Sequence, residues 1–426
     1  MKLKELCKIK HGFAFKGKDI IKNYSTKYVL VTPGNFNIGG GFKKEKCKYF
    51  SENGNIPKDY ILRENDLIVT MTDLSVKSDT LGYSALIPKD NNIYLHNQRI
   101  GLVYDIDESK VLKDYLYWFM RTKKYQQEVV ASQSGTAIHH TSPARILNIE
   151  IDLPSIDNQR KIVKILSDVE HKIKNNNDTN NNLQELINNI FISKFVNYYG
   201  YTGEYETTEI GDIPSNWKVD NLGNVISFSN GYGWNSKDML ENNQPDTYKV
   251  FKMGNIKIGG GINKEKTRSW ILKEKCSGLE QFLSKKGDIL MCMTDMKSSE
   301  NPLLGHTALI DCDDEFVINQ RVGIIRCDKD IRWPYIYTMT NLPFFINNIR
   351  SKAHSGVQVN LTTSGICDTK VLIPDKYSLE EFYKNVTPMY EEMFILNNEI
   401  EKLEELRDTL LPKLMNGEID LDNIEI

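Results

Sequence analysis

The chain has 426 residues, of which 40% are hydrophobic and 26% charged, with a formal net charge of −3. This composition is typical of a soluble globular protein. No apolar run approaches the roughly 20 residues that cross a bilayer, and the first residues lack the apolar core of a signal peptide. We therefore expect a cytoplasmic protein.

The charge balance argues against a simple nucleic-acid binder, for which a basic domain is expected. However, the acidity gathers in residues 376–426, which hold 5 basic and 13 acidic residues. The rest of the chain can therefore still accept a polyanion. The 7 cysteines include no Cys-x-x-Cys pair, which favours reduced thiols over a disulfide framework or a metal site.

The chain contains an internal repeat. Residues 34–46 recur as residues 254–266, with 9 of 13 positions identical. Three further landmarks recur at offsets of 222 or 223 residues, close to the 220 of the first pair. They are 66–73 with 288–295, 82–87 with 305–310, and 97–101 with 319–323. This period is far longer than that of a solenoid, so the repeat predicts two similar domains.

Each copy reads as short strands followed by helices, in a mixed α/β fold. Residues 67–70 and 289–292 are apolar runs that predict strands. Residues 112–125 carry apolar side chains at helical spacing, and residues 333–349 do so in the second copy, where Pro343 predicts a break. Apolar residues before Pro154 and Pro374 predict a closing strand in each copy.

A long heptad pattern follows each copy. In residues 162–194 and 382–414, apolar residues alternate at spacings of three and four over about five heptads, which is typical of a coiled coil. We expect these helices to pack against each other. The alternative is two amphipathic helices, each packed on its own domain.

Residues 174–182 are almost entirely asparagine, which costs up to about 0.7 kcal/mol per residue relative to alanine in a helix. We expect the helix to continue here, with Asn176 and Asn180 at core positions where buried amides can fix register. A low-complexity linker is the alternative.

Several segments resemble one family. Residues 406–419, Leu-Arg-Asp-Thr-Leu-Leu-Pro-Lys-Leu-Met-Asn-Gly-Glu-Ile, look like the C-terminus of specificity subunits of type I restriction–modification enzymes. Residues 154–162 are similar to the segment that opens the family's first conserved helix, although Asn158 stands where a glutamate is common. Residues 209–217 resemble the usual entry into a recognition domain. The resemblance spans essentially the whole chain.

The resemblance implies two target recognition domains separated by two long antiparallel coiled-coil helices. We expect the first recognition domain at 1–154, the first helix at 155–199, the second domain at 200–375, the second helix at 376–416 and a tail at 417–426. Each domain would read one half of a bipartite site in double-stranded DNA, and the helices would set the spacing between the halves.

The resemblance also implies that the chain is not itself an enzyme. Two methyltransferase subunits and the restriction subunits would supply catalysis, with S-adenosylmethionine, ATP and magnesium bound to those partners and no cofactor on this chain. The sequence agrees, since it lacks the Asn/Asp-Pro-Pro-aromatic loop of amino-methyltransferases and any His-x-x-x-His metal pair. Residues 12–19 fall one residue short of a phosphate-binding loop, with Asp19 in place of the magnesium-binding hydroxyl. Asp73 and Asp295 end apolar strands, where we expect them to cap turns.

Candidate DNA-reading residues lie in three places. Lysines and an arginine flank the glycine-rich repeat, where backbone could approach phosphate, although a plain hairpin turn fits as well. Arg99 and Arg321 follow Asn-Gln in strand-like runs, and a structural role is their alternative. The loop at 134–141 shares a frame with 355–362, with His139 aligned to Asn360. The candidates are Lys43, Lys44, Lys46, Arg99, Ser134, His139, His140, Lys264, Lys266, Arg268, Arg321, Gln358 and Asn360.

Because the copies share so much loop chemistry, we expect the half-sites to share bases. Two other functions stay open: the specificity chain of a related system whose partner fuses methylation with cleavage, and an unrelated two-headed protein-binding scaffold.

Overall fold

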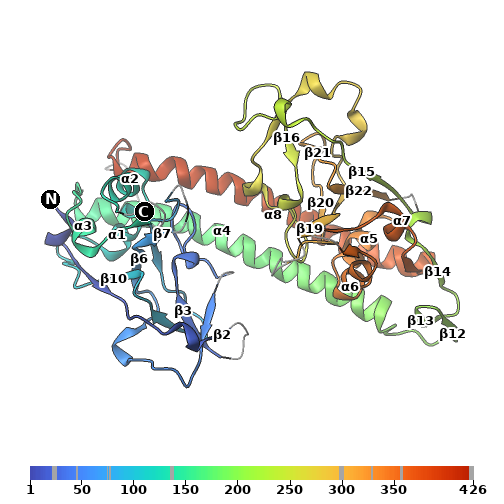
Figure 1. Cartoon of the computed structure of the whole chain (residues 1–426), viewed down its shortest axis with the longest axis horizontal. Helices are drawn as coiled ribbons and strands as arrows, with labels where there is room; N and C mark the ends of the chain where they lie inside the picture. Colours follow the sequence, from blue (N-terminus) through green and yellow to red (C-terminus); the bar gives the residue numbers. More distant parts are fainter. Residues whose placement is uncertain are drawn as a thin grey trace. The chain divides into compact units, whose positions relative to one another are not determined.

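The computed structural model describes residues 1–21, 26–44, 47–73, 75, 78–134, 139–296, 302–327, 330–355 and 358–421. It divides into two compact units, which are shown in Figure 1. The first unit comprises residues 1–175 and 399–426, and the second comprises residues 176–398. Each unit therefore holds one copy of the repeat together with part of both long helices.

The described residues of the first unit form an antiparallel four-stranded sheet, a mixed five-stranded sheet and a short strand pair. The four-stranded sheet runs in the order β1 (Lys8–His11), β10 (Ile100–Tyr104), β6 (Leu67–Thr70), β8 (Ser84–Leu86). The five-stranded sheet runs in the order β2 (Ile20–Ile21), β4 (Lys48–Phe50), β3 (Tyr28–Val31), β9 (Ile93–His96), β5 (Ile61–Leu62). The pair consists of β7 (Thr72–Asp73) and β11 (His139–His140).

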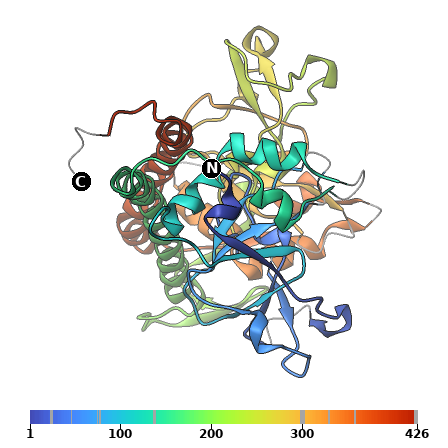
Figure 2. The same ribbon diagram turned by 90° about the vertical axis from the view of Figure 1, so that its left-hand side faces the viewer.

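Its helices are α1 (Lys113–Phe119), α2 (Lys123–Ala131) and α3 (Pro143–Leu147), followed by the long α4 (Ile156–Phe191), which continues into the second unit. The strands and short helices of this unit are the blue and teal parts of Figures 1 and 2.

The second unit repeats the plan. Its four-stranded sheet runs β15 (Ile226–Asn230), β22 (Val322–Cys327), β18 (Ile289–Cys292), β20 (Thr307–Leu309). Two three-stranded sheets run β17 (Trp270–Leu272), β16 (Thr247–Phe251), β21 (Phe316–Ile318), and β19 (Thr294–Met296), β24 (Gln358–Asn360), β23 (His354–Ser355). Two strand pairs are β12 (Tyr205–Thr208) with β13 (Gly211–Pro214), and β14 (Lys218–Asn221) with β25 (Lys370–Ile373).

Its helices are α5 (Trp333–Thr340), α6 (Pro343–Ser351), α7 (Thr363–Cys367) and most of α8 (Lys376–Met415). A π-helical turn at Ile192–Val196 follows α4.

The inner strands β6 and β18 of the two four-stranded sheets are buried on both faces, which explains their unbroken apolar sequences. In β6, Leu67 and Val69 pack into the core formed with the helices, whereas Ile68 faces the core formed with the second sheet. Ile289 and Leu290 divide in the same way in β18. The predicted strands at 67–70 and 289–292 are confirmed.

Two predictions for the first copy are wrong. The helix expected over 112–125 breaks into α1 and α2 because the Thr122 side chain accepts a hydrogen bond from the backbone of Tyr125 and starts a new helix. The break predicted at Pro343 in the second copy is confirmed.

The closing strand expected before Pro154 is reduced to a single bridge between Lys2 and Glu150, whereas β25 forms in the second unit because β14 pairs with it.

The two long helices contact each other in antiparallel fashion within each unit. In the first unit, Leu166 of α4 shares a core with Leu414 of α8. In the second unit, Asn180 Nδ2 donates a hydrogen bond to Asn397 Oδ1 at 3.0 Å, and Lys194 pairs with Glu381. Packing between the helices is thus confirmed in both units.

The helix α4 continues through the asparagine-rich stretch, as predicted. Asn176 is 3% exposed and Asn180 is 9% exposed, so both amides occupy the buried stripe that the heptad pattern assigned to them. The apolar residues around them, such as Ile173 and Ile187, are also buried. Their burial offsets the poor helix propensity of asparagine.

Candidate nucleic-acid interface

The glycine-rich repeat forms a braced loop in each unit. Asn35, which is fully buried, accepts a hydrogen bond from the Thr32 backbone and donates one to the Lys43 carbonyl. Asn255 makes the same pair of bonds to Lys252 and Asn263. The recurring Gly-Asn therefore serves to close the loop.

The three glycines of each loop are required by the backbone and by close packing. Residues 39–41 and 259–261 all have positive φ angles between 81° and 111°. A Cβ on Gly40 would lie 2.5 Å from Cγ of Arg121, and one on Gly260 would lie 2.9 Å from the hydroxyl of Tyr337. The glycine-rich segment thus packs against the residues of and just after α1 and α5, which supports the turn interpretation over phosphate contact by these glycines.

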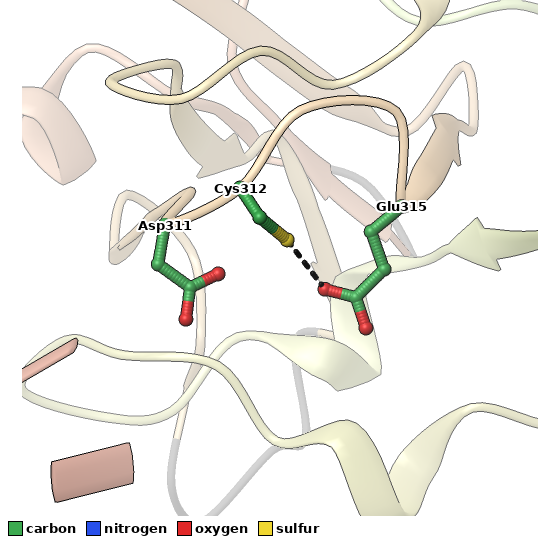
Figure 3. A group of neighbouring side chains, drawn as sticks. All are labelled: Asp311, Cys312 and Glu315. Carbon is green, nitrogen blue, oxygen red and sulfur yellow. Dashed lines mark hydrogen bonds between the residues drawn. The ribbon is translucent and has the colours of Figure 1, made fainter. Parts of the chain in front are cut away.

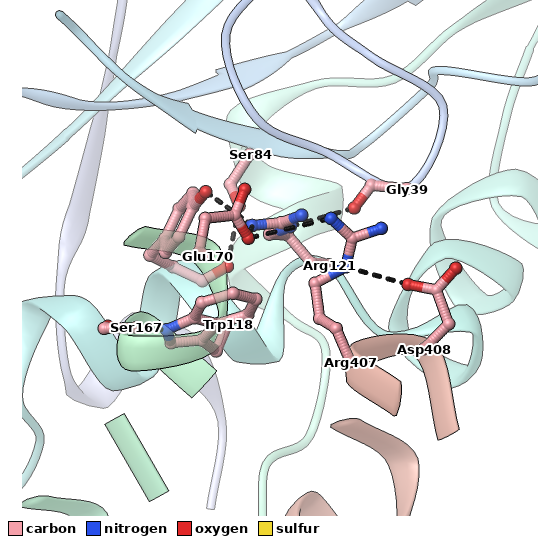
Figure 4. Close-up of polar contacts among 9 residues, drawn as sticks. Gly39, Ser84, Trp118, Arg121, Ser167, Glu170, Arg407 and Asp408 are labelled. Carbon is pink, nitrogen blue, oxygen red and sulfur yellow. Dashed lines mark hydrogen bonds and ion pairs between the residues drawn. The ribbon is translucent and has the colours of Figure 1, made fainter. Parts of the chain in front are cut away.

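Arg121 is the residue that sequence reasoning missed. Its side chain is only 3% exposed, yet its guanidinium donates to the Gly39 carbonyl, the Tyr117 hydroxyl and the Glu170 carboxylate (Figure 4). Glu170 lies on α4 and also pairs with Arg407 of α8 at 3.8 Å. One buried cation therefore connects the glycine-rich loop to the long helices. The only sequence signal was an arginine among apolar helical residues.

The lysines around the loops have different environments. Lys44 pairs with Asp90 at 2.8 Å, and Lys264 pairs with Glu315 at 3.3 Å. Lys43 is half-buried, while Lys266 and Arg268 are exposed. Lys46 lies outside the described residues. Lys266 and Arg268 therefore offer the freest positive charge of this group.

Glu315 belongs to the cluster of Asp311, Cys312 and Glu315 in Figure 3, whose ligand atoms lie within 4.8 Å of one another. Burial would raise the pKa of Glu315, but Lys249 and Lys264 hold it below its usual value. Burial and the hydrogen bond to Glu315 raise the pKa of the Cys312 thiol to about 12. The Glu315 carboxylate is already paired with Lys249 and Lys264 and accepts a hydrogen bond from Cys312, which favours a structural network over a metal site.

Arg99 and Arg321 lie in exposed turns, so the prediction that they sit inside strands is wrong. The turn joins β9 to β10 in the first unit and β21 to β22 in the second. In each, the asparagine Oδ1 (Asn97 or Asn319) accepts a hydrogen bond from the arginine backbone, at 3.1 and 3.3 Å.

The strand pairs beside these turns correct the alignment of the loop at 134–141. His140 pairs with Thr72, and Asn360 pairs with the equivalent Thr294. His140 rather than His139 is thus the counterpart of Asn360, because the helix-capping residues Ser142 and Thr362 fix the frame one residue away from the expected one.

The remaining residues of this loop differ in exposure. His139 is half-buried, whereas His140 and Ser134 are exposed, and Ser134 accepts a hydrogen bond from Arg145 at 3.0 Å. In the second unit, Gln358 and Asn360 are exposed on β24. Residues 135–138, between Ser134 and His139, lie outside the described part of the chain.

One backbone segment joins the turn to the strand pair in each unit. The Met71 amide donates to the Arg99 carbonyl, and the Met71 carbonyl accepts from Thr141, the residue after His140. Met293 makes the equivalent bonds to Arg321 and Leu361. The structure therefore brings Arg99 near His140, and Arg321 near Asn360, although each pair lies about 40 residues apart in the sequence.

The segment that resembled a phosphate-binding loop borders the same turn. The backbone amide of Gln98 donates a hydrogen bond to the Phe13 carbonyl, and the backbone amide of Gln320 donates one to the Tyr232 carbonyl. Lys16 and Lys18, further along the first segment, are exposed. This segment adds positive charge beside the turn in the first unit.

Asp73 and Asp295 cap loops, as expected. The Asp73 carboxylate accepts from the Ser75 amide at 2.6 Å and from the amide and hydroxyl of Thr80. Asp295 accepts from the amides of Met296 and Leu303. Burial opposes ionisation of Asp73, but these bonds lower its pKa below the usual value.

Comparison with known proteins agrees with this architecture. Residues 1–185 match the family model described as type I restriction modification DNA specificity domain. The chain is 22% identical over 376 residues to the type I restriction enzyme MjaVIII specificity subunit of Methanocaldococcus jannaschii, covering 86% of this chain and 82% of that protein. It is also 22% identical over 372 residues to the HindI specificity subunit of Haemophilus influenzae, covering 75% and 80% of the two chains.

The fold is also that of a solved structure. The S subunit of a type I restriction–modification system from M. genitalium superposes with a TM-score of 0.56 at 16% identity, over 97% of this chain and 95% of that one. Residues 1–185 of this chain are thus similar to the DNA specificity domain of type I restriction–modification systems. The chain as a whole is a relative of the specificity subunits of type I restriction–modification enzymes.

Among the described helices, none is both long enough and apolar enough to span a membrane.

Proposed function

We propose that this chain is the sequence-specificity subunit of a type I restriction–modification complex, in which each repeat reads one half of a bipartite DNA target. The observation that carries the proposal is the recurrence of the same exposed Asn-Gln-Arg turn in both units, each beside a strand with exposed polar residues. Arginine and glutamine suit guanine and adenine edges in the major groove.

The long helices have two roles in this proposal. They set the distance between the half-sites, and they dock two methyltransferase subunits. The chain itself performs no catalysis. The partner subunits bind S-adenosylmethionine, ATP and magnesium, and restriction subunits join the same complex.

Two measurements test the proposal. Specific binding of the assembled complex to its duplex is expected to weaken steeply as salt rises, because phosphate contacts release counterions. Removing one heptad from each helix is expected to change the spacer of the methylated motif. An unchanged spacer would show that the helices do not set the distance between the half-sites, and would leave the proposal that each unit reads a half-site intact.

The two alternative functions, a specificity chain of a system with fused methylation and cleavage and a protein-binding scaffold, predict different results. A partner that carries nuclease and methyltransferase motifs in one chain would favour the fused system. Absence of salt-dependent duplex binding would favour a protein-binding scaffold.

A further inference from the structure

The Asn-Gln-Arg turns of the two units are held by the same backbone bonds. In each turn, the main-chain carbonyl of the asparagine accepts a hydrogen bond from the residue after the arginine. The main-chain amide of the glutamine donates to the carbonyl of an aromatic residue (Phe13 or Tyr232). The main-chain carbonyl of the arginine accepts from the amide of a methionine (Met71 or Met293). The asparagine side chain adds a further bond to the arginine amide. The main chain of both turns is therefore rigid.

The glutamine and arginine side chains contrast with this backbone. Gln98, Arg99, Gln320 and Arg321 are all exposed. Within the described parts of the chain, their side chains make no hydrogen bond or ion pair. The fold therefore does not require these side chains, yet both turns present them at the same positions. Base recognition needs side-chain donors and acceptors that are free of protein partners and are held in place by a fixed backbone.

The neighbouring strands carry the difference between the units. His140 and Asn360 occupy equivalent positions, opposite Thr72 and Thr294. The His140 ring is oriented by a contact of 3.1 Å between Nδ1 and the Thr72 hydroxyl. Imidazole and carboxamide groups present different hydrogen-bonding patterns to a base edge.

We infer that the Gln-Arg pair of each turn reads bases common to both half-sites, and that His140 and Asn360 read a base at which the half-sites differ. This inference rests on the proposed function and assigns its specificity to four shared side chains and one exchanged position. The target is then two partly identical half-sites, read on equivalent strands.

The experiment uses the full chain assembled with its methyltransferase partner, and it reads the methylated motif by methylome sequencing. Arg99→Ala and Gln98→Ala are expected to relax one or two base positions in one half-site only. Arg321→Ala and Gln320→Ala are expected to relax the equivalent positions in the other half-site. Discrimination against the wrong base is expected to fall roughly 5- to 150-fold for each lost bidentate contact.

The exchanges His140→Asn and Asn360→His test the second part. Each exchange is expected to change the preference at one base, toward the base found in the other half-site. The affected base is expected in the half-site that the Arg variant of the same unit identifies, at a position other than those that the Arg variant relaxes. Lys48→Ala is the matched control, because Lys48 is an exposed cation on β4 of the first unit and its loss removes the same charge as Arg99→Ala. The control is expected to leave the motif unchanged.

An unchanged motif in the Arg99 and Arg321 variants would overturn the inference, as would an equal loss of binding to all sequences, which indicates phosphate contact. Thermal melting of each variant separates these results from misfolding, and Arg99→Lys offers a second, milder change. If the wild-type chain confers no methylated motif on its partner, the proposed function itself fails.

Discussion

Arg121 and Glu170 form an ion pair with a distance of 2.9 Å between Arg121 Nη1 and Glu170 Oε2, and this pair links the segment after α1 to helix α4. The Arg121 side chain is 3% exposed and the Glu170 side chain 33% exposed, so the cation depends on its partners more than the carboxylate does. In the second unit, Asn341 stands at the equivalent position and bonds to Thr307 and Tyr337. This position is therefore charged and bonded to a long helix in the first unit, and neutral and bonded to Thr307 and Tyr337 in the second.

Replacing Arg121 by alanine is expected to destabilise the first unit. The change leaves the Gly39 carbonyl and the Tyr117 hydroxyl without their donor and empties a packed site, and breaking a buried pair costs about 3–5 kcal/mol. Partial exposure of Glu170 places the expected cost at the lower end of that range. A urea denaturation midpoint and hydrogen exchange in residues 39–41 measure the effect. Glu170→Gln keeps an acceptor but leaves the buried guanidinium without its counter-charge, so it is also expected to lower the denaturation midpoint.

Gly40→Ala is expected to be more destabilising than Gly39→Ala. Both residues have φ near +85°, where alanine costs roughly 1–2 kcal/mol. A Cβ on Gly39 meets nothing within 4 Å, whereas one on Gly40 would overlap the base of the buried Arg121 side chain. The difference in melting temperature between the two variants isolates the packing term. Equal effects would contradict the close approach.

Asn180→Leu is expected to stabilise the helix pair. Asn180 is 9% exposed, its Oδ1 has no hydrogen-bond partner among the described protein atoms, and its partner Asn397 is exposed to solvent. An apolar residue at a core position therefore adds packing at little polar cost, about 1 kcal/mol or more. Asn181→Leu, at an exposed position of the same helix, is the control for helix propensity alone. A lower melting temperature for Asn180→Leu than for Asn181→Leu would refute the expectation.

Stability is expected to fall between about pH 6.5 and pH 4 because of two buried histidines. Burial lowers the pKa of His96 and of His306 to about 4, below the value near 6.5 of an unfolded chain. The unfolded state therefore binds more protons in this window, so the contribution of each histidine is complete above pH 6.5 and is lost as the pH falls toward 4. His96→Gln is expected to flatten the pH dependence of the melting temperature over this range.

The sequence alone determined the duplication, the strands at 67–70 and 289–292, and the long helices, because each depends on periodic local patterns. It also pointed to the Asn-Gln-Arg triplets, since they recur with the repeat. It misplaced them in strands and aligned His139 with Asn360 by counting residues, because single-residue register is set by pairing between distant strands.

Only the tertiary structure decided which of these residues meet. The backbone of Met71, between β6 and β7, brings Arg99 beside His140. The packing of Gly40 against Arg121 assigns the glycine-rich loop to the structural framework of the unit. Spacing along the chain could not reveal either relationship, since both depend on contacts between segments that are remote in sequence. Local periodicity is encoded by neighbouring residues, whereas a recognition surface is assembled from the ends of several elements.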